Sequence, residues 1–203
     1  MAIDQTITQK LEALDTAIQE IECDREQAEP IRDGIIDPEK YFSTKYKILW
    51  ILKEPYESVD DEGSPCGGDW DLREVINKKN TASDLQGGGK NTYTRMTYVS
   101  FSILNGFPSW NDMELIKNDP SMLDALKSIA YINVKKLPGH TTSTESIIAT
   151  AYKTYNELLL QQIDAFIPDV IIGGGTLHHF VADLKLSGLE KCQIGSVSYY
   201  SNN

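Results

Sequence analysis

Reactive side chains follow the first apolar run of this sequence, residues 47–52 (KILWIL), which is typical of a buried strand. Lys53, Glu54 and Tyr56 come directly after that run. A partly buried carboxylic acid has a raised pKa and can activate water near neutral pH, so Glu54 is a candidate general base. We predict Glu54 as the catalytic residue, with Lys53 and Tyr56 binding substrate. The alternative for Glu54 is a structural ion pair with a neighbouring cation.

A second polar group ends the next apolar run (IAYINV) and contains Asn133, Lys135 and Lys136. The Asn133 side chain offers both hydrogen-bond donors and an acceptor, which recognition of the amide edge of a pyrimidine requires. A turn residue that bonds to nearby backbone is the alternative. The two lysines, together with Lys78 and Lys79, are candidate phosphate contacts, although lysine pairs also occur on solvated faces.

Three consecutive glycines, residues 173–175, follow a third apolar run (DVII) and precede a predicted helix. Backbone N–H groups at such a turn can hold an anion, so Gly174 is predicted to contact the substrate. The spacing matches neither a Walker motif nor a complete G-x-G-x-x-G, and a tight strand-to-helix turn is the alternative. His178 and His179 are adjacent, so we expect their rings to diverge and to be structural, with no metal site and no cofactor.

These three runs and a fourth, residues 193–199 (QIGSVSY), are short and nearly continuous, as in strands buried on both faces of a parallel sheet. Helical patterns lie between them, at residues 94–105 and from a capping box of Thr142 and Glu145 to about residue 166. Strands that alternate with helices imply right-handed crossovers. The predicted fold is therefore a three-layer α/β/α sandwich with a central four-stranded parallel sheet.

The N-terminal segment differs from the rest of the chain. Residues 7–21 carry apolar side chains at spacings of three and four, which predicts an amphipathic helix packed on the domain, or a partner-binding helix. Helix breakers then divide the chain into an acidic helix and linker, residues 1–40, and a single α/β domain, residues 41–203. The polar, glycine-containing residues 57–91 are predicted to form a long loop over the ligand crevice at the carboxyl ends of the strands.

Composition excludes several classes of protein. The net charge is −11, and residues 1–40 contribute eleven acidic against four basic side chains, which argues against general coating of nucleic acid. No apolar run approaches the length of about 18 residues that a membrane-spanning helix needs, and the first residues lack an apolar signal core. The three cysteines are far apart in the sequence, which indicates reduced thiols in a cytoplasmic protein without membrane partners.

Taken together, the polar groups resemble motifs of the uracil-DNA glycosylase superfamily. In that family the first strand ends in a motif of the Gly-Gln-Asp-Pro-Tyr-His or Gly-Glu-x-Pro-Gly type, and residues 49–56 here read LWILKEPY. A later strand ends in an asparagine that reads the flipped base, and residues 129–139 read IAYINVKKLPG. A Pro-Asp-Val-Ile strand then leads to a glycine turn, similar to PDVIIGGGTLHHF at residues 168–180. The resemblance spans residues 45–200.

The sequence departs from the family pattern at three places. Leu52 replaces the glycine of the first motif, and Glu54 stands where the best-known members have an aspartate. In the family a His-Pro-Ser motif follows the fourth strand and supplies a histidine that stabilises the departing base. The corresponding part of this chain reads SVSYYSNN.

The resemblance implies hydrolysis of the N-glycosidic bond of a base rotated out of the stack, without a metal or organic cofactor. Glu54 would orient water or stabilise the sugar cation, Tyr56 would line the pocket, and Asn133 would read the base. The partner would be DNA, a nucleobase or a nucleotide. Two alternatives remain, namely an inactive nucleobase- or nucleotide-binding module of the same fold, and an unrelated α/β hydrolase that holds a phosphate ester at residues 173–175.

Overall fold

The fold is seen in a computed structural model, which describes residues 4–23, 28–87, 89–194 and 197–201. Four strands form its main sheet, in the order β1 (Gly34–Ile35), β3 (Ala130–Asn133), β2 (Ile48–Leu52) and β4 (Val170–Gly173). β2 is parallel to both β3 and β4, whereas the short edge strand β1 is antiparallel to β3. The protein is therefore an α/β protein with a mostly parallel sheet.

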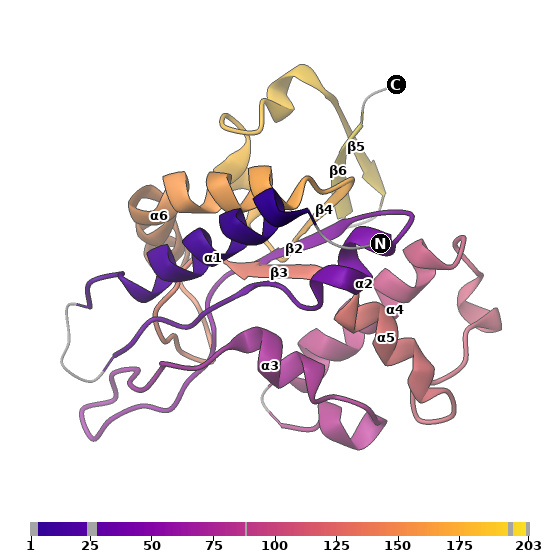
Figure 1. Ribbon diagram of the computed structural model, residues 1–203, viewed down its shortest axis with the longest axis horizontal. Helices are drawn as coiled ribbons and strands as arrows, with labels where there is room; N and C mark the ends of the chain where they lie inside the picture. Colours follow the sequence, from indigo (N-terminus) through magenta and orange to yellow (C-terminus); the bar gives the residue numbers. More distant parts are fainter. Residues whose placement is uncertain (1–3, 24–27, 88, 195–196, 202–203) are drawn as a thin grey trace.

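The central strand β2 explains why the sheet is buried on both sides. Leu49 and Ile51 point into one hydrophobic cluster, and Ile48 and Trp50 point into another on the opposite face. Side chains alternate between the two faces of a strand, so a continuous apolar run requires cover on both faces. Helices α1 and α6 supply that cover on one face, and helices α3, α4 and α5 supply it on the other (Figure 1).

The helices vary widely in length. The α-helices are α1 (Gln5–Gln19), α2 (Pro38–Ser43), α3 (Leu72–Asn77), α4 (Lys90–Leu104), α5 (Leu123–Lys127) and α6 (Glu145–Phe166). Short 3-10 helices are η1 (Ala82–Leu85), η2 (Trp110–Asp112), η3 (Pro120–Met122), η4 (Leu177–Phe180) and η5 (Leu186–Gly188). The predicted helix that ends at residue 166 is confirmed, but its N-cap is Thr144, so the capping box expected from Thr142 is wrong.

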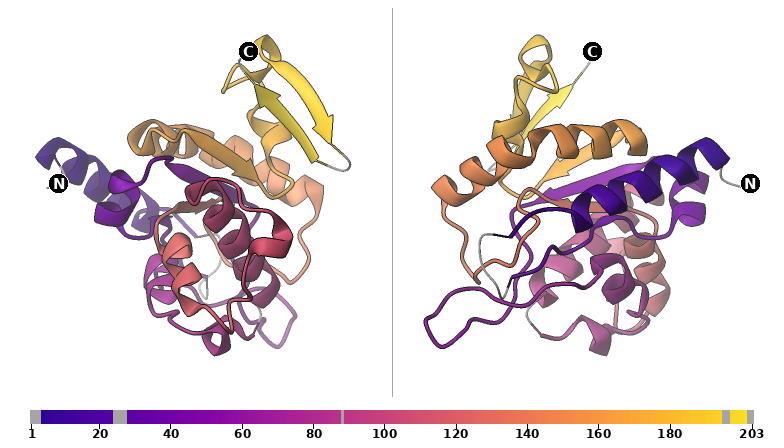
Figure 2. Two further views of the ribbon diagram at one scale, coloured as in Figure 1. Left: turned by 90° about the vertical axis from the view of Figure 1, so that its right-hand side faces the viewer. Right: turned by 60° about the vertical axis from the view of Figure 1, so that its left-hand side comes forward.

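The prediction of a fourth parallel strand at residues 193–199 is wrong. Its described residues belong to two strands, β5 (Glu190–Ile194) and β6 (Val197–Ser201), which pair antiparallel as a separate hairpin; residues 195–196 lie outside the described ranges. Figure 2 shows this hairpin standing apart from the main sheet. The fourth strand of the main sheet is instead β1, from the N-terminal part of the chain.

Residues 57–91 are not one long loop. Within them lie α3, with Leu72 and Ile76 buried against the sheet, and η1, with Leu85 buried; Gly88 lies outside the described residues. These apolar side chains gain enough burial to order the second half of the segment. The first half, residues 57–71, is a loop that reaches away from the sheet (Figure 1).

The N-terminal segment is packed on the α/β body. Leu14 and Ile18 of α1 are buried, which confirms the predicted apolar face. Arg73 of α3 forms an ion pair with Asp15 of α1 through two hydrogen bonds of 2.9 Å. Because β1 also joins the main sheet, residues before 41 contribute to the core as well as connecting to it. Within the described ranges, no helix combines the length and the apolar character needed to cross a membrane.

Candidate functional site

The carboxyl ends of three strands are held together beside one pocket. The parallel hydrogen bonding continues past the strands, from Lys135 N to the Lys53 carbonyl and from Gly174 N to the Ile51 carbonyl, each 2.9 Å. A pocket of about 360 Å³ opens at this edge. Its lining residues come from the sheet, from the loops after β2 and β4, and from α4: Trp50, Leu52, Lys53, Glu54, Thr92, Arg95, Met96, Tyr131 and Gly174.

Glu54 is the buried carboxylate of this pocket. Its side chain is only 2% exposed, and its Oε2 atom accepts a hydrogen bond of 3.2 Å from Lys135 Nζ. The Oε1 atom is buried and has no hydrogen-bond partner. The Lys135 ammonium also donates to the Pro138 carbonyl, and this second bond holds the cation beside the carboxylate. Glu54 therefore lies in the pocket, as a catalytic base would, and also forms the ion pair that the alternative interpretation of this residue expected.

Gly139 allows Glu54 to take this position. A β-carbon at Gly139 would overlap the Glu54 carboxyl group, so only glycine leaves room for the acid. Gly139 itself is fixed by backbone hydrogen bonds to Pro55 and Glu57, at 2.8 and 3.2 Å. The loop after β3 thus forms one wall around the carboxylate, and the rigid backbone of Pro55 forms part of the support.

Asn133 lies close to the pocket but does not line it. Its side chain is 1% exposed, and its Oδ1 atom accepts a hydrogen bond of 3.4 Å from the Tyr131 hydroxyl. Its Nδ2 atom is buried without a partner. Burial raises the pKa of Tyr131, so its hydroxyl remains protonated and able to donate. Tyr131 lines the pocket, whereas Asn133 does not.

The remaining predicted substrate contacts divide into two cases. Lys53 and Gly174 line the pocket, and their contact with a substrate stays a prediction. Gly174 packs so tightly against Leu52 that a β-carbon would overlap the leucine side chain. Tyr56 is 54% exposed and is absent from the pocket lining, because its backbone pairs with Gly139 and its ring points elsewhere.

The four predicted phosphate-contacting lysines do not form one basic surface. Lys136 is completely buried, and its ammonium donates to both Asp33 carboxylate oxygens and to Gln162, each at 2.8 Å, so the prediction of a phosphate contact is wrong there. Burial lowers the pKa of Lys136, and the Asp33 carboxylate opposes that effect. Lys135 is occupied by Glu54.

Of the two lysines after α3, Lys78 is exposed and Lys79 is half-buried, and both are engaged locally. The Nζ atom of Lys78 lies 3.5 Å from Glu74 Oε2. The Lys79 ammonium donates to the Asp84 carbonyl and lies 4.8 Å from the centre of the Tyr93 ring. Neither lysine lines the pocket.

Residues of α4 are the part of the pocket that the sequence predictions missed. Thr92, Arg95 and Met96 stand three and four positions apart, so they share one face of the helix. That spacing is visible in the sequence, but the predicted helix begins at residue 94, and none of its polar residues is among the predicted ligand contacts. Arg95 adds a second cation to the pocket beside Lys53, opposite in charge to Glu54.

A histidine pair stands at the same edge of the sheet. The rings of His178 and His179 were expected to diverge, but their centroids are 4.0 Å apart, because both approach the Glu145 carboxylate at the start of α6. The Nε2 atoms lie 2.7 and 3.2 Å from Glu145 Oε1. Burial, His178 and Lys53 lower the pKa of His179, against the opposing Glu145 charge, so this ring is neutral at pH 7.

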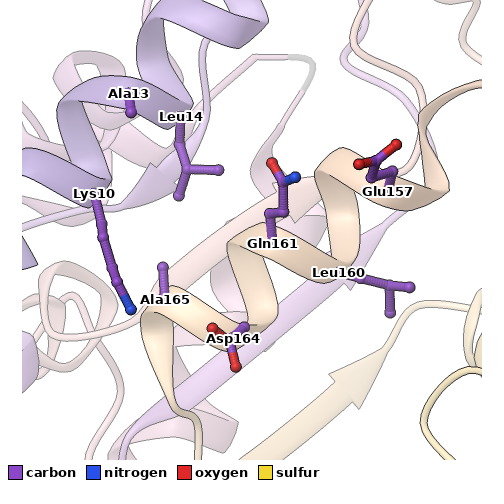
Figure 3. Close-up of a pocket in the computed structure, with 8 residues that line it drawn as sticks. All are labelled: Lys10, Ala13, Leu14, Glu157, Leu160, Gln161, Asp164 and Ala165. Carbon is purple, nitrogen blue, oxygen red and sulfur yellow. The ribbon is translucent and has the colours of Figure 1, made fainter.

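A second groove lies elsewhere, between α1 and α6, with a volume of about 490 Å³. Figure 3 shows Lys10 extending from α1 toward the turn of α6 that carries Asp164 and Ala165. The groove is lined by four aliphatic residues, Ala13, Leu14, Leu160 and Ala165, and by four polar or charged ones, Lys10, Glu157, Gln161 and Asp164. Pockets that carry chemistry bring several polar groups together inside an enclosure, and the pocket at the strand ends does so.

Comparisons of the chain with protein-family models, with curated proteins and with solved structures find no match. The functional assignment therefore depends on the geometry of the pocket at the carboxyl ends of the strands.

Proposed function

We propose that the pocket at the strand ends binds a nucleobase-containing ligand and that Glu54 catalyses hydrolysis of its N-glycosidic bond. The observation that carries this proposal is the buried Glu54 carboxylate, with one oxygen held by Lys135 and the other unpartnered. A buried acceptor without a donor is unfavourable by about 1–3 kcal/mol, and a bound water or substrate hydroxyl would relieve it. The uracil-DNA glycosylase resemblance, with its three-layer sandwich, is part of the same proposal.

The chemistry requires a base, a positioned water and a way to accept charge on the leaving group. Water attacks C1′ of the sugar and gives its proton to Glu54 Oε1, while the bond from C1′ to the base breaks and its electrons leave with the base. The Lys135 ammonium donates a hydrogen bond to the other carboxylate oxygen, Oε2, and leaves Oε1 to take the proton. Arg95 and Lys53 are the cations in the pocket that can stabilise the departing base or a phosphate.

Base recognition by Asn133 requires a change in Tyr131. The unpartnered Asn133 amide nitrogen is a suitable donor for a pyrimidine carbonyl, but Asn133 does not line the cavity, whereas its hydrogen-bond partner Tyr131 does. A rotation of Tyr131 would expose the amide and place the ring beside the base, where it can stack. Trp50 provides a second aromatic side chain in the lining.

A free nucleoside or nucleotide fits this pocket better than duplex DNA. A protein that flips a base from DNA also needs cations that hold the flanking phosphates. Lys136 is buried, Lys135 is paired with Glu54, and the chain carries a net charge of −11. We therefore propose a nucleoside monophosphate as the substrate, with Arg95 and Lys53 facing its phosphate.

A second candidate function is binding of the same ligand without hydrolysis. The observation that favours it is the composition of the pocket lining, which includes none of His140, His178 and His179. A histidine that stabilises the departing base is therefore missing from the described pocket, and the two cations must serve instead.

The test compares wild type with Glu54→Gln, which keeps the shape of the side chain and removes its charge. Incubation with deoxyuridine monophosphate is followed by chromatography of the released base, and binding is measured by calorimetry. We expect base release by wild type and a loss of at least about 100-fold in the variant, with binding retained. Glu62→Gln is the matched control, because Glu62 is exposed and lies outside the pocket.

Each outcome decides between the candidates. Equal base release by wild type and Glu54→Gln would refute the catalytic role of Glu54. Binding by wild type without base release would favour the binding module. If wild type neither binds nor cleaves the nucleotide, both candidates fail.

A further inference from the structure

Glu145, His178 and His179 bring three metal-ligand atoms together near the N-terminus of α6. One ligand atom from each side chain lies within 4.8 Å of the other two. The three residues come from two elements, α6 and η4, that are far apart in the sequence, so the fold and not a local turn creates the cluster. It stands next to the pocket of the proposed function but shares no lining residue with it.

The separations are close to those of a metal site. Two ligands on one tetrahedral Zn²⁺, with bonds of about 2.0–2.1 Å, lie about 3.3 Å apart. His179 Nε2 is already 3.2 Å from Glu145 Oε1, whereas the His178 contact, at 2.7 Å, is a direct hydrogen bond. The side chains of His178 and Glu145 are 55% and 61% exposed. Each is therefore free to move by the fraction of an ångström that would widen their contact to the separation of two metal ligands.

His179 supplies an independent observation that points to a ligand. Its side chain is only 9% exposed, and its Nε2 atom is buried without a hydrogen bond of acceptable geometry. The ring stacks on Tyr152, with centroids 5.6 Å apart, and the Tyr152 hydroxyl is held by Asp183. The ring is thus fixed in place with an unpartnered nitrogen facing Glu145, which is the arrangement of a preorganised ligand.

We propose that Glu145, His178 and His179 bind a divalent transition-metal ion of the zinc class. Two imidazoles and one carboxylate form a donor set that zinc uses in three-ligand sites, where the fourth position is left to water or substrate. Imidazole nitrogens favour Zn²⁺ over Mg²⁺ or Ca²⁺, which prefer oxygen ligands. Lys53 is a cation that faces the same group from the loop after β2, and the Glu145 carboxylate offsets its charge.

The experiment measures binding of Zn²⁺ alone to the full chain by calorimetry. We expect one ion per chain for wild type. Glu145→Gln and His178→Ala should each weaken Zn²⁺ binding by more than about tenfold. Mutation of residues that only support a metal ligand already lowers metal affinity by that much. Both substitutions are at exposed side chains, so the fold should persist, and circular dichroism checks this. His140→Ala is the matched control, because His140 is exposed and lies outside the cluster.

A second readout uses Co²⁺, whose visible absorption reports coordination geometry. A tetrahedral spectrum in wild type that disappears in Glu145→Gln supports the site. The proposal is overturned if wild type binds no Zn²⁺, or if Glu145→Gln and His178→Ala bind it as tightly as wild type, which would place the ion on other ligands. Neither measurement uses a nucleotide, so its failure is distinct from failure of the proposed function.

Discussion

Glu54 and Gly139 are in such close contact that the glycine controls where the carboxylate lies. The Glu54 carboxyl group occupies the space that a β-carbon at Gly139 would fill. Nothing in the apolar run before Glu54 reveals this contact, because Gly139 lies 85 positions further along the chain. The position of Glu54 beside a pocket was predictable from the strand end, but the group that fixes its orientation was not.

Replacement of Gly139 by alanine should displace the Glu54 carboxylate without unfolding the chain. A shift of about 1 Å in a catalytic group can lower a rate by about 100-fold, so base release by Gly139→Ala should fall by that order. The rate is measured by chromatography of the released base. Gly188→Ala is the control, because a β-carbon there meets no atom within 4 Å. Equal rates for the two variants would show that catalysis by Glu54 does not depend on its contact with Gly139.

The contrast between Lys135 and Lys136 shows what sequence alone could not provide. Adjacent residues of an extended chain point to opposite sides, so one of the two lysines was bound to turn inward. The partner that makes burial tolerable is Asp33, 103 positions away, and only the fold brings it into place. A surface role is therefore wrong for Lys136, whereas for Lys135, which is paired with Glu54, the phosphate contact stays a prediction.

Removal of the Lys136 ammonium should be strongly destabilising. Lys136→Met leaves the Asp33 carboxylate buried without its cation, and breaking such a pair lowers the free energy of unfolding by about 3–5 kcal/mol. Urea denaturation measures the change. Lys78→Met, at a side chain that is 77% exposed, should stay within about 0.5 kcal/mol of wild type. A loss below about 1 kcal/mol for Lys136→Met would contradict the importance of the pair.

Among the elements, the strands that form continuous apolar runs were predictable, whereas the shortest strand was not. β2, β3 and β4 were found because each is a continuous apolar run. β1 has two residues, too few for a pattern. The β5–β6 hairpin carried a signal that was missed, because the dipeptide Gly195-Ser196 between the two strands is typical of a hairpin turn.

The ion pair between Asp71 and Arg73 at the start of α3 should make stability depend on acid pH. Burial alone would raise the pKa of Asp71, but hydrogen bonds and charge from Arg73 hold that pKa below its usual value. A lowered pKa in the folded state adds stability above the pKa of the unfolded chain, and this contribution is lost as pH falls through the folded value. Asp71 also caps α3, through the Arg73 amide.

Asp71→Asn keeps the cap and removes the charge. At pH 7 the free energy of unfolding should fall by about 1.5–3 kcal/mol, the range for hydrogen bonds to charged groups. The difference from wild type should begin to narrow below about pH 4, the ordinary pKa of an aspartate in the unfolded chain, and should disappear only below the lowered pKa of folded Asp71. Urea denaturation across this pH range is the measurement. A difference that stays constant down to pH 2 would show that the charge of Asp71 is not responsible.

At the scale of the whole molecule, the charge distribution limits the substrate class. The net charge is −11, and seven of those negative charges lie in residues 1–40, which pack on the body through α1. A field of this sign repels polyphosphate at long range, whereas one phosphate in the pocket, as proposed, would meet Arg95 and Lys53 at short range.

Duplex DNA should therefore bind poorly. Fluorescence anisotropy with a labelled uracil-containing duplex should show no binding at about 200 mM salt and only weak binding at about 50 mM. Deoxyuridine monophosphate should bind under both conditions, because its phosphate is held inside the pocket. Tight duplex binding with a steep dependence on salt would contradict the choice of a nucleotide as the substrate and would favour DNA instead.

The central claim, that Glu54 acts on an N-glycosidic bond, is tested most directly by identifying the products formed from deoxyuridine monophosphate. The account predicts free uracil and deoxyribose phosphate with wild type and neither product with Glu54→Gln. Deoxyuridine and inorganic phosphate would instead mean that the phosphate ester is cleaved at residues 173–175. That result, or free uracil from both proteins in equal amounts, would contradict the claim.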